Sequence, residues 1–221
     1  MTNRILRGRL RPGARRGFTL LELTLVIAII GILMTFLLPK GLDIYYRAKV
    51  TACEANLGEI FKWYQIFKMD RSHFPKESGV KNFLSLWEVV EHTDSNAARL
   101  TCPEPDPPDG LFDPETKRLR KPAQWFEHMD QVDGSYTTYA GRDTKAFPMR
   151  SLSGDEPLVS DDNDGGPNHK AGVTLALYGN GEVKKFNLVQ LKKEGVLPAD
   201  EKNLEVGPDS PIEDLRKLSR D

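Results

Sequence analysis

A lone carboxylate, Glu22, lies near the start of a long apolar segment in this chain of 221 residues. It is the only charged residue between residues 20 and 38. Six arginines and no acidic residue precede that segment, and Gly17-Phe18 marks the boundary between the basic and apolar stretches. An ionised carboxylate in apolar surroundings is costly unless a cation or a proton neutralises it. Glu22 therefore predicts a site that meets a positively charged group.

The segment that carries Glu22 has the length of a membrane-spanning helix. As a helix, its 19 residues would extend about 28 Å, close to the ~30 Å hydrocarbon core of a bilayer. A secretory signal peptide is disfavoured, because the segment is long and residues 39–43 contain no small-residue cleavage site. An uncleaved single-span anchor explains the length and the arginines, which would keep the N-terminus cytoplasmic. It does not explain Glu22 or the Gly17-Phe18 boundary.

The same stretch resembles the class III signal of type IV pilins and type II secretion pseudopilins. Four residues stand at the family's spacing: Gly17, Phe18, Glu22 and Pro39. The resemblance implies that a prepilin peptidase cleaves after Gly17 and methylates the new amine of Phe18. It also implies that Glu22 of one subunit pairs with the Phe18 amine of a neighbour during assembly. The implied partners are the peptidase, further pilin or pseudopilin subunits in a homopolymer, an inner-membrane assembly platform and membrane lipid.

An amphipathic pattern continues beyond the apolar segment. Apolar residues recur at intervals of three or four from Leu42 to Phe67. We therefore expect one helix over residues 18–69, membrane-spanning at about 20–38 and bent at Pro39. A basic leader occupies residues 1–17 and an extracytoplasmic globular domain residues 70–221. The second half of the helix needs a partner surface from that domain.

The globular part predicts an α+β fold. Two strands at residues 173–178 and 182–186 flank a turn with Gly179 and Gly181, which indicates a hairpin. Shorter strands are expected at 135–139 and 156–160, and helices at 80–91, 188–194 and 210–218, after which the last residues fray. With the family resemblance, this implies a pilin-like fold in which the long helix packs on a small antiparallel sheet.

The charge distribution argues against nucleic-acid binding. The net charge of the chain is −1, but residues 18–221 carry 25 basic and 32 acidic side chains. Nucleic-acid-binding proteins instead present a basic stripe.

The two cysteines, Cys53 and Cys102, favour a disulfide. An extracytoplasmic domain permits one, and the bridge would close a loop of about 50 residues. Two reduced, buried thiols are the alternative. Neither cysteine stands in a C-x-x-C motif or beside a histidine in the sequence, so zinc is not expected.

An acidic loop holds the residues best suited to calcium: Asp161, Asp162 and Asp164. Major pseudopilins commonly bind calcium in a C-terminal loop, which the resemblance implies here. The register of an EF-hand fails, however, and a solvated turn is the favoured interpretation. His169, which follows this loop, is interpreted as a structural histidine.

No recognised catalytic motif occurs in the chain, so we expect no enzymatic activity. The sequence favours a structural subunit of a type II secretion pseudopilus in the bacterial inner membrane, single-pass, with the C-terminal domain periplasmic or extracellular. A type IV pilin for adhesion or motility is the alternative, and an uncleaved membrane-anchored binding domain is another. The position of Cys53 on the first helix leaves no second cysteine for a stapled C-terminal loop of the pilin type, which favours the pseudopilin.

Overall fold

The computed structural model describes residues 17–104, 110–111, 115, 126–152, 154–163 and 166–221. The chain forms two compact units that meet at residues 42 and 43. The first contains the apolar part of one long helix, α1 (Leu20–Arg71), and the second contains the rest of that helix and all the strands.

The N-terminal half of α1 is apolar on all sides and exposed. Leu20, Ile27 and Leu37 have 81%, 60% and 60% of their surface exposed. Taken one at a time, none of the described helices combines the length and apolar composition needed to cross a bilayer. The segments Leu20–Thr35 and Lys40–Arg71, joined at a bend, meet that requirement together.

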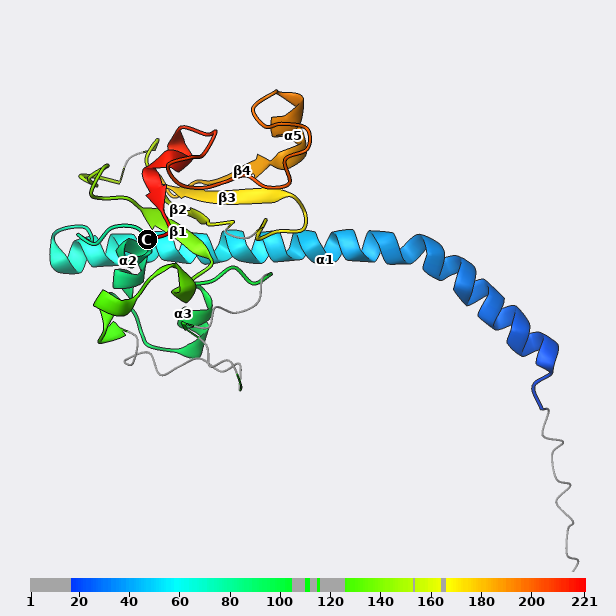
Figure 1. Cartoon of the computed structure of the whole chain (residues 1–221). Helices are drawn as coiled ribbons and strands as arrows, with labels where there is room; N and C mark the ends of the chain where they lie inside the picture. The colour runs from blue at the N-terminus through cyan, green and yellow to red at the C-terminus, as the bar shows by residue number, and fades with distance from the viewer. Residues whose placement is uncertain (1–16, 105–109, 112–114, 116–125, 153, 164–165) are drawn as a thin grey trace, which may run out of the picture. The chain divides into compact units, whose positions relative to one another are not determined.

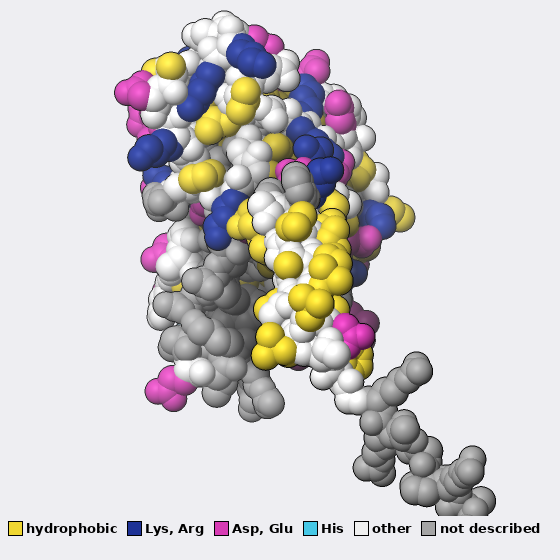
Figure 2. Space-filling view, turned by 90° about the vertical axis from the view of Figure 1, so that its right-hand side faces the viewer, with side chains coloured by type: hydrophobic (Ala, Val, Ile, Leu, Met, Phe, Trp, Pro, Cys, Tyr) yellow, Lys and Arg dark blue, Asp and Glu magenta, His cyan; other side chains and the backbone are white. Residues whose placement is uncertain are grey.

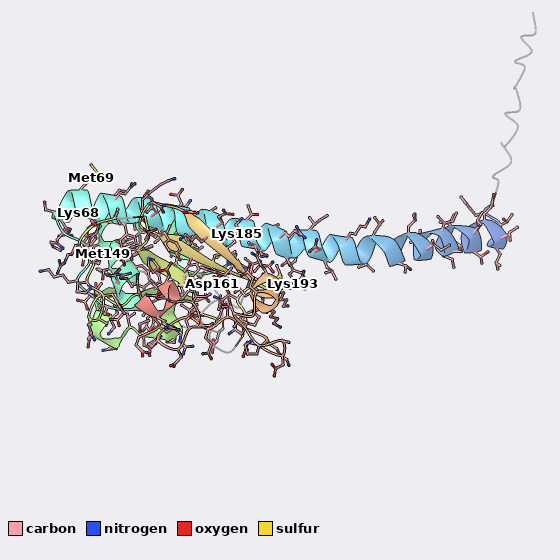
Figure 3. All side chains as sticks on the ribbon, turned by 90° about the horizontal axis from the view of Figure 1, so that it is seen from above. Lys68, Met69, Met149, Asp161, Lys185 and Lys193 are labelled. Atoms are coloured by element: carbon pink, nitrogen blue, oxygen red, sulfur yellow. The ribbon has the colours of Figure 1, made fainter. Side chains whose placement is uncertain are left out.

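The C-terminal half of α1 is amphipathic, as its spacing predicts, and its apolar stripe is buried. Cys53, Leu57, Ile60 and Tyr64 have no exposed surface. Their partner surface is the antiparallel sheet, which lies along this half of the helix (Figure 1). An ion pair of 2.7 Å between Lys185 Nζ and the Glu54 carboxylate joins the sheet to the helix at the surface (Figure 3).

The sheet has five antiparallel strands in the order β4-β3-β2-β1-β5. This confirms the predicted α+β class and the small sheet packed on a long helix. The strands are β1 (Tyr139–Arg142), β2 (Pro157–Asp161), β3 (Val173–Tyr178), β4 (Val183–Asn187) and β5 (Leu218–Ser219).

The β3–β4 hairpin forms as its turn residues predict. The Tyr178 amide donates to the Glu182 carbonyl over 2.8 Å, and the Gly181 amide donates to the Tyr178 carbonyl over 2.9 Å. Gly181 has a φ of +84°, a conformation that side-chain-bearing residues rarely adopt. A Cβ there would also lie 2.8 Å from the Phe61 ring of α1, so glycine serves both the turn and the packing.

The remaining helical elements are short and help to close the core. They are α2 (Val80–Leu84), η1 (Ser85–Val89), α3 (Asp94–Ala98), η2 (Met129–Gln131), η3 (Gly134–Tyr136), α5 (Leu188–Lys193) and η4 (Asp214–Lys217). The expected helix at 80–91 is therefore an α-helical turn followed by a 3₁₀ segment. Its apolar face is buried, including Phe83 and Trp87.

Two local predictions were wrong. The strand expected at 135–139 begins only at Tyr139, because the Asp133 side chain accepts the Ser135 amide hydrogen at 2.9 Å and caps the 3₁₀ turn η3. The helix expected at 210–218 is the short η4, and the chain then pairs as β5 along the edge of β1 instead of fraying. Leu215 and Leu218 are fully buried, which holds this end in place.

Candidate functional sites at the helix start and in a buried cluster

Glu22 closes a capping box at the start of α1. The Glu22 amide donates to Thr19 Oγ1 at 3.2 Å, and the Thr19 amide and hydroxyl each donate to Glu22 Oε2 at 2.9 Å. This reciprocal arrangement satisfies two backbone donors that a helix start otherwise leaves unpaired. The Thr19-x-x-Glu22 spacing before an apolar run is the sequence signature of this capping box, a signal that the sequence-based prediction did not use.

The two residues before this cap, Gly17 and Phe18, are exposed on the surface. Gly17 and Phe18 precede the helix in non-helical conformation, and Phe18 is 86% exposed. A peptide bond in that state is accessible to a peptidase, because the backbone is not engaged in helical hydrogen bonds. Just beyond, hydrophobic side chains cover the visible face of the apolar helix (Figure 2).

A second site, which the sequence did not predict, lies inside the globular unit. Cys53, Cys102, Asp161 and His169 bring one ligand atom each to within 4.8 Å of one another. Cys53 comes from α1 and Cys102 follows α3. Asp161 ends β2 and is labelled in Figure 3. His169 lies in the connection from β2 to β3. All four side chains are buried, none being more than 2% exposed.

The contacts within this cluster are close. Cys53 Sγ lies 3.6 Å from Asp161 Oδ1, and Cys102 Sγ lies 3.4 Å from His169 Nε2. The same His169 Nε2 lies 3.5 Å from Asp161 Oδ2. One imidazole nitrogen therefore faces both a thiol and a carboxylate.

Further groups hold the cluster from outside. His169 Nδ1 contacts Glu104 Oε2 at 3.0 Å, and the Lys170 amide donates to the other Glu104 oxygen at 2.9 Å. Asp161 Oδ2 accepts the Leu175 amide hydrogen at 2.8 Å. A hydrogen bond of 3.2 Å joins the Tyr139 hydroxyl to Cys53 Sγ. Each of these contacts fixes the orientation of one member of the cluster.

Burial and mutual charge shift the pKa values in this cluster. Burial raises the pKa of Asp161 to about 6, although the charge of His169 opposes the shift. Burial acts to lower the pKa of His169, but the Cys102 contact and the Asp161 charge outweigh it and raise that pKa to about 9. The Cys53 contact lowers the pKa of Cys102 to about 7. Burial raises the pKa of Cys53 well above its usual value. Cys102 is thus the thiol that ionises more readily.

The two cysteines are close, but they are not bridged. Both are free thiols in this structure, so the expected disulfide is not formed. No histidine lies near either cysteine in the sequence, but in the fold His169 reaches Cys102 across 67 residues of sequence. The histidine itself was visible in the sequence, but no spacing motif linked it to either cysteine.

The residues proposed for calcium have different surroundings in the structure. Asp161 points into the buried cluster, whereas Asp162 accepts a hydrogen from Asn168 Nδ2 at 3.5 Å. Asp161 is the last residue of β2, whereas Asp162 lies just after the strand ends. Asp164 lies outside the described residues. A calcium site there stays a prediction, and it would have to form without Asp161.

Comparison with known proteins identifies the N-terminal segment. Residues 13–38 match the family model of the prokaryotic N-terminal methylation motif. The type IV wide pilus major component PilA4 of Thermus thermophilus is 39% identical over 71 residues, which is 32% of this chain. The match spans about half of that relative, 54% of its length. No solved structure matches the chain.

The long N-terminal helix packed on a small antiparallel sheet is the arrangement of a pilin-like fold, and the N-terminal segment of the chain is similar to the type IV pilin signal. Its N-terminal signal is of the prepilin type, and this signal indicates anchoring in a membrane through the N-terminal helix.

Proposed function

We propose that the chain is a structural subunit of a type II secretion pseudopilus. It is made as an inner-membrane precursor, cleaved after Gly17 and methylated at Phe18. The observation that carries the proposal is the coincidence of the methylation motif with an exposed, non-helical Gly17-Phe18 directly before a capped apolar helix.

The exposed apolar surface of α1 supports a cycle between lipid and filament. In the membrane, lipid covers side chains such as Ile27 and Leu37. In the filament, neighbouring helices cover the same side chains, so little apolar surface meets water in either state. The N-terminus is cytoplasmic before cleavage, since six arginines flank that end, and the globular unit is periplasmic.

Glu22 supplies the register between subunits in this proposal. Cleavage creates an amine at Phe18, and the Glu22 carboxylate of a neighbour neutralises it inside the helix bundle. A single buried polar pair specifies register, because a shifted neighbour would leave a charge unpaired. The prepilin peptidase, an assembly platform of the inner membrane and further copies of the chain are the partners.

A type IV pilus is the second candidate, and the likeness to a major pilus component favours it. Two observations support the pseudopilus. The C-terminal end is held by pairing of β5 with β1, and both cysteines lie elsewhere, in α1 and after α3. A strain that lacks the gene should lose export of folded proteins while keeping its surface fibres. Loss of fibres with intact export would assign the chain to a pilus.

The mature N-terminus tests the processing step. In cells with a prepilin peptidase, intact-mass spectrometry should find a chain that lacks residues 1–17 and carries one added methyl group. The Gly17→Val variant should keep its leader, because the branched side chain crowds the peptide bond that is cut. Gly13→Val is the matched control and should be processed normally. An intact, unmethylated wild-type chain would support an uncleaved anchor instead.

A further inference from the structure

We propose that Cys53, Cys102, Asp161 and His169 form a structural zinc site in the globular unit. The inference does not depend on the type of filament. It rests on four potential ligand atoms that gather within 4.8 Å, from α1, from the segment after α3 and from the end of β2 with the connection that follows it.

The spacing of the ligand atoms fits a tetrahedral ion. Zinc binds cysteine sulfur at about 2.3 Å and histidine nitrogen or carboxylate oxygen at about 2.0–2.2 Å. A regular tetrahedron with these bond lengths separates its ligand atoms by about 3.3–3.8 Å. Three separations fall in this range: 3.4 Å between Cys102 Sγ and His169 Nε2, 3.5 Å between His169 Nε2 and Asp161 Oδ2, and 3.6 Å between Cys53 Sγ and Asp161 Oδ1. With one ligand atom from each residue, all pairs lie within 4.8 Å.

The surroundings have the pattern that supports metal ligands. A zinc-bound histidine usually donates its other N–H to a carboxylate, which fixes the tautomer and the ring orientation. Glu104 stands in that place, 3.0 Å from Nδ1, and leaves Nε2 directed at Cys102 and Asp161. The Leu175 amide and the Tyr139 hydroxyl hold Asp161 and Cys53 in the same way.

The donor set selects zinc over calcium or magnesium. Both of those ions prefer oxygen ligands, and calcium takes six to eight of them. Two thiols, an imidazole and one carboxylate suit a borderline-soft ion with four ligands. Because all four ligands are supplied by buried protein groups, no coordination position is left for substrate, so the site is structural. Zinc would displace the thiol protons and take the lone pair of neutral Nε2, releasing protons to water.

The bound ion would clamp the globular unit onto α1. Cys53 belongs to the helix, Asp161 to the sheet, and Cys102 and His169 to two connecting segments. The same two thiols cannot both bind zinc and form a disulfide. The zinc-bound form and the disulfide-bonded form of the chain therefore exclude each other, and the fraction of chains in each form can be measured.

The experiment uses the full chain, purified in detergent without chelator and with a mild reductant. Elemental analysis should find one zinc ion per chain, and chelation should lower the melting temperature. Asp161→Asn and Cys102→Ser should lose the zinc. Asp162→Asn, one residue from a ligand, is the matched control and should keep it. Circular dichroism shows whether each variant is folded.

A positioning variant keeps the test valid if the ligand variants fail to fold. Glu104→Gln leaves all four ligands in place but removes the charge beside His169. It should weaken zinc binding about 10–100-fold in competition with a chromophoric chelator. The cobalt-loaded wild type should show the strong visible absorption of a tetrahedral thiolate site. Folded, reduced wild-type chain that takes up neither metal would overturn the proposal. A Cys53–Cys102 disulfide in chain isolated from cells, found by alkylation and mass spectrometry, would overturn it too.

Discussion

Glu22 combines two tasks that a single substitution to alanine cannot separate. Its carboxylate caps α1 through Thr19, and in the proposed filament it also neutralises the Phe18 amine of a neighbour. Glutamine accepts the same hydrogen bonds at this position of a capping box but carries no charge. Glu22→Gln therefore isolates the charge, and Thr19→Ala isolates the cap.

If the charge sets the register, Glu22→Gln should abolish filaments as fully as Glu22→Ala. Thr19→Ala should still assemble, because it leaves the carboxylate free to pair. Filament yield after overexpression, scored by electron microscopy and sedimentation, measures both outcomes. Normal assembly of Glu22→Gln would reduce the role of Glu22 to helix capping.

At the same scale, the sequence predicted the N-terminal methylation motif, which residues 13–38 match, and missed the buried cluster. The N-terminal motif lies within a short stretch of sequence, so it can be recognised from the spacing of Gly17, Phe18 and Glu22. No sequence motif links the four residues of the buried cluster, because it is the fold that brings their ligand atoms within 4.8 Å of one another. These residues are Cys53, Cys102, Asp161 and His169. The sequence grouped Asp161 with Asp162 and Asp164 for that reason. Its neighbours in sequence are acidic, whereas its neighbours in space include two thiols.

Individual elements were predictable where turn chemistry and periodicity agreed. The stripe on α1 and the β3–β4 hairpin follow from spacing and from glycines in the turn. The prediction at 135–139 was wrong, because the pattern of that segment suggested a strand while the Asp133 cap favoured a 3₁₀ turn. The edge strand β5 was missed, because two residues hold no periodicity and their pairing with β1 depends on tertiary contacts.

The junction after β1 offers a test of how such elements are joined. The Asp143 carboxylate accepts hydrogen bonds from Ser78 Oγ at 2.8 Å and from the Lys145 and Ala146 amides at 3.1 and 3.2 Å. Burial acts to raise the pKa of Asp143, but these hydrogen bonds outweigh it and hold the pKa below its usual value. The ionised carboxylate therefore stabilises the fold.

Asp143→Asn should lower the free energy of unfolding by about 1 kcal/mol at pH 7. A lowered folded-state pKa gives a stabilisation that is complete above the unfolded-state pKa of ~3.9 and is lost as the pH falls through the folded value. The gap between wild type and variant should thus close in acid. Denaturant melts at several pH values measure it, with the exposed Asp200→Asn as control. A gap that stays constant with pH would mean that the charge is not responsible.

One part of the molecule exposes apolar surface, whereas the other part buries its own core. Residues 20–42 expose apolar surface that needs lipid or neighbouring helices. Residues 43–221 form a compact unit with its own buried core of helix, sheet and connecting segments. A unit that buries its own core does not need the membrane segment to fold.

A fragment of residues 43–221 should therefore be soluble without detergent and unfold cooperatively, with a free energy of roughly 5–15 kcal/mol. Asp43 at its first helical turn favours the new helix start, because a negative charge there offsets the helix dipole. A fragment that begins at residue 60 is the matched control. It lacks Cys53 and Leu57, both fully buried, and should fail to fold because the core loses these side chains. Circular dichroism melts and size-exclusion chromatography compare the two fragments. Aggregation of the 43–221 fragment, or a melt without cooperativity, would show that the N-terminal half of α1 contributes to the stability of the globular unit.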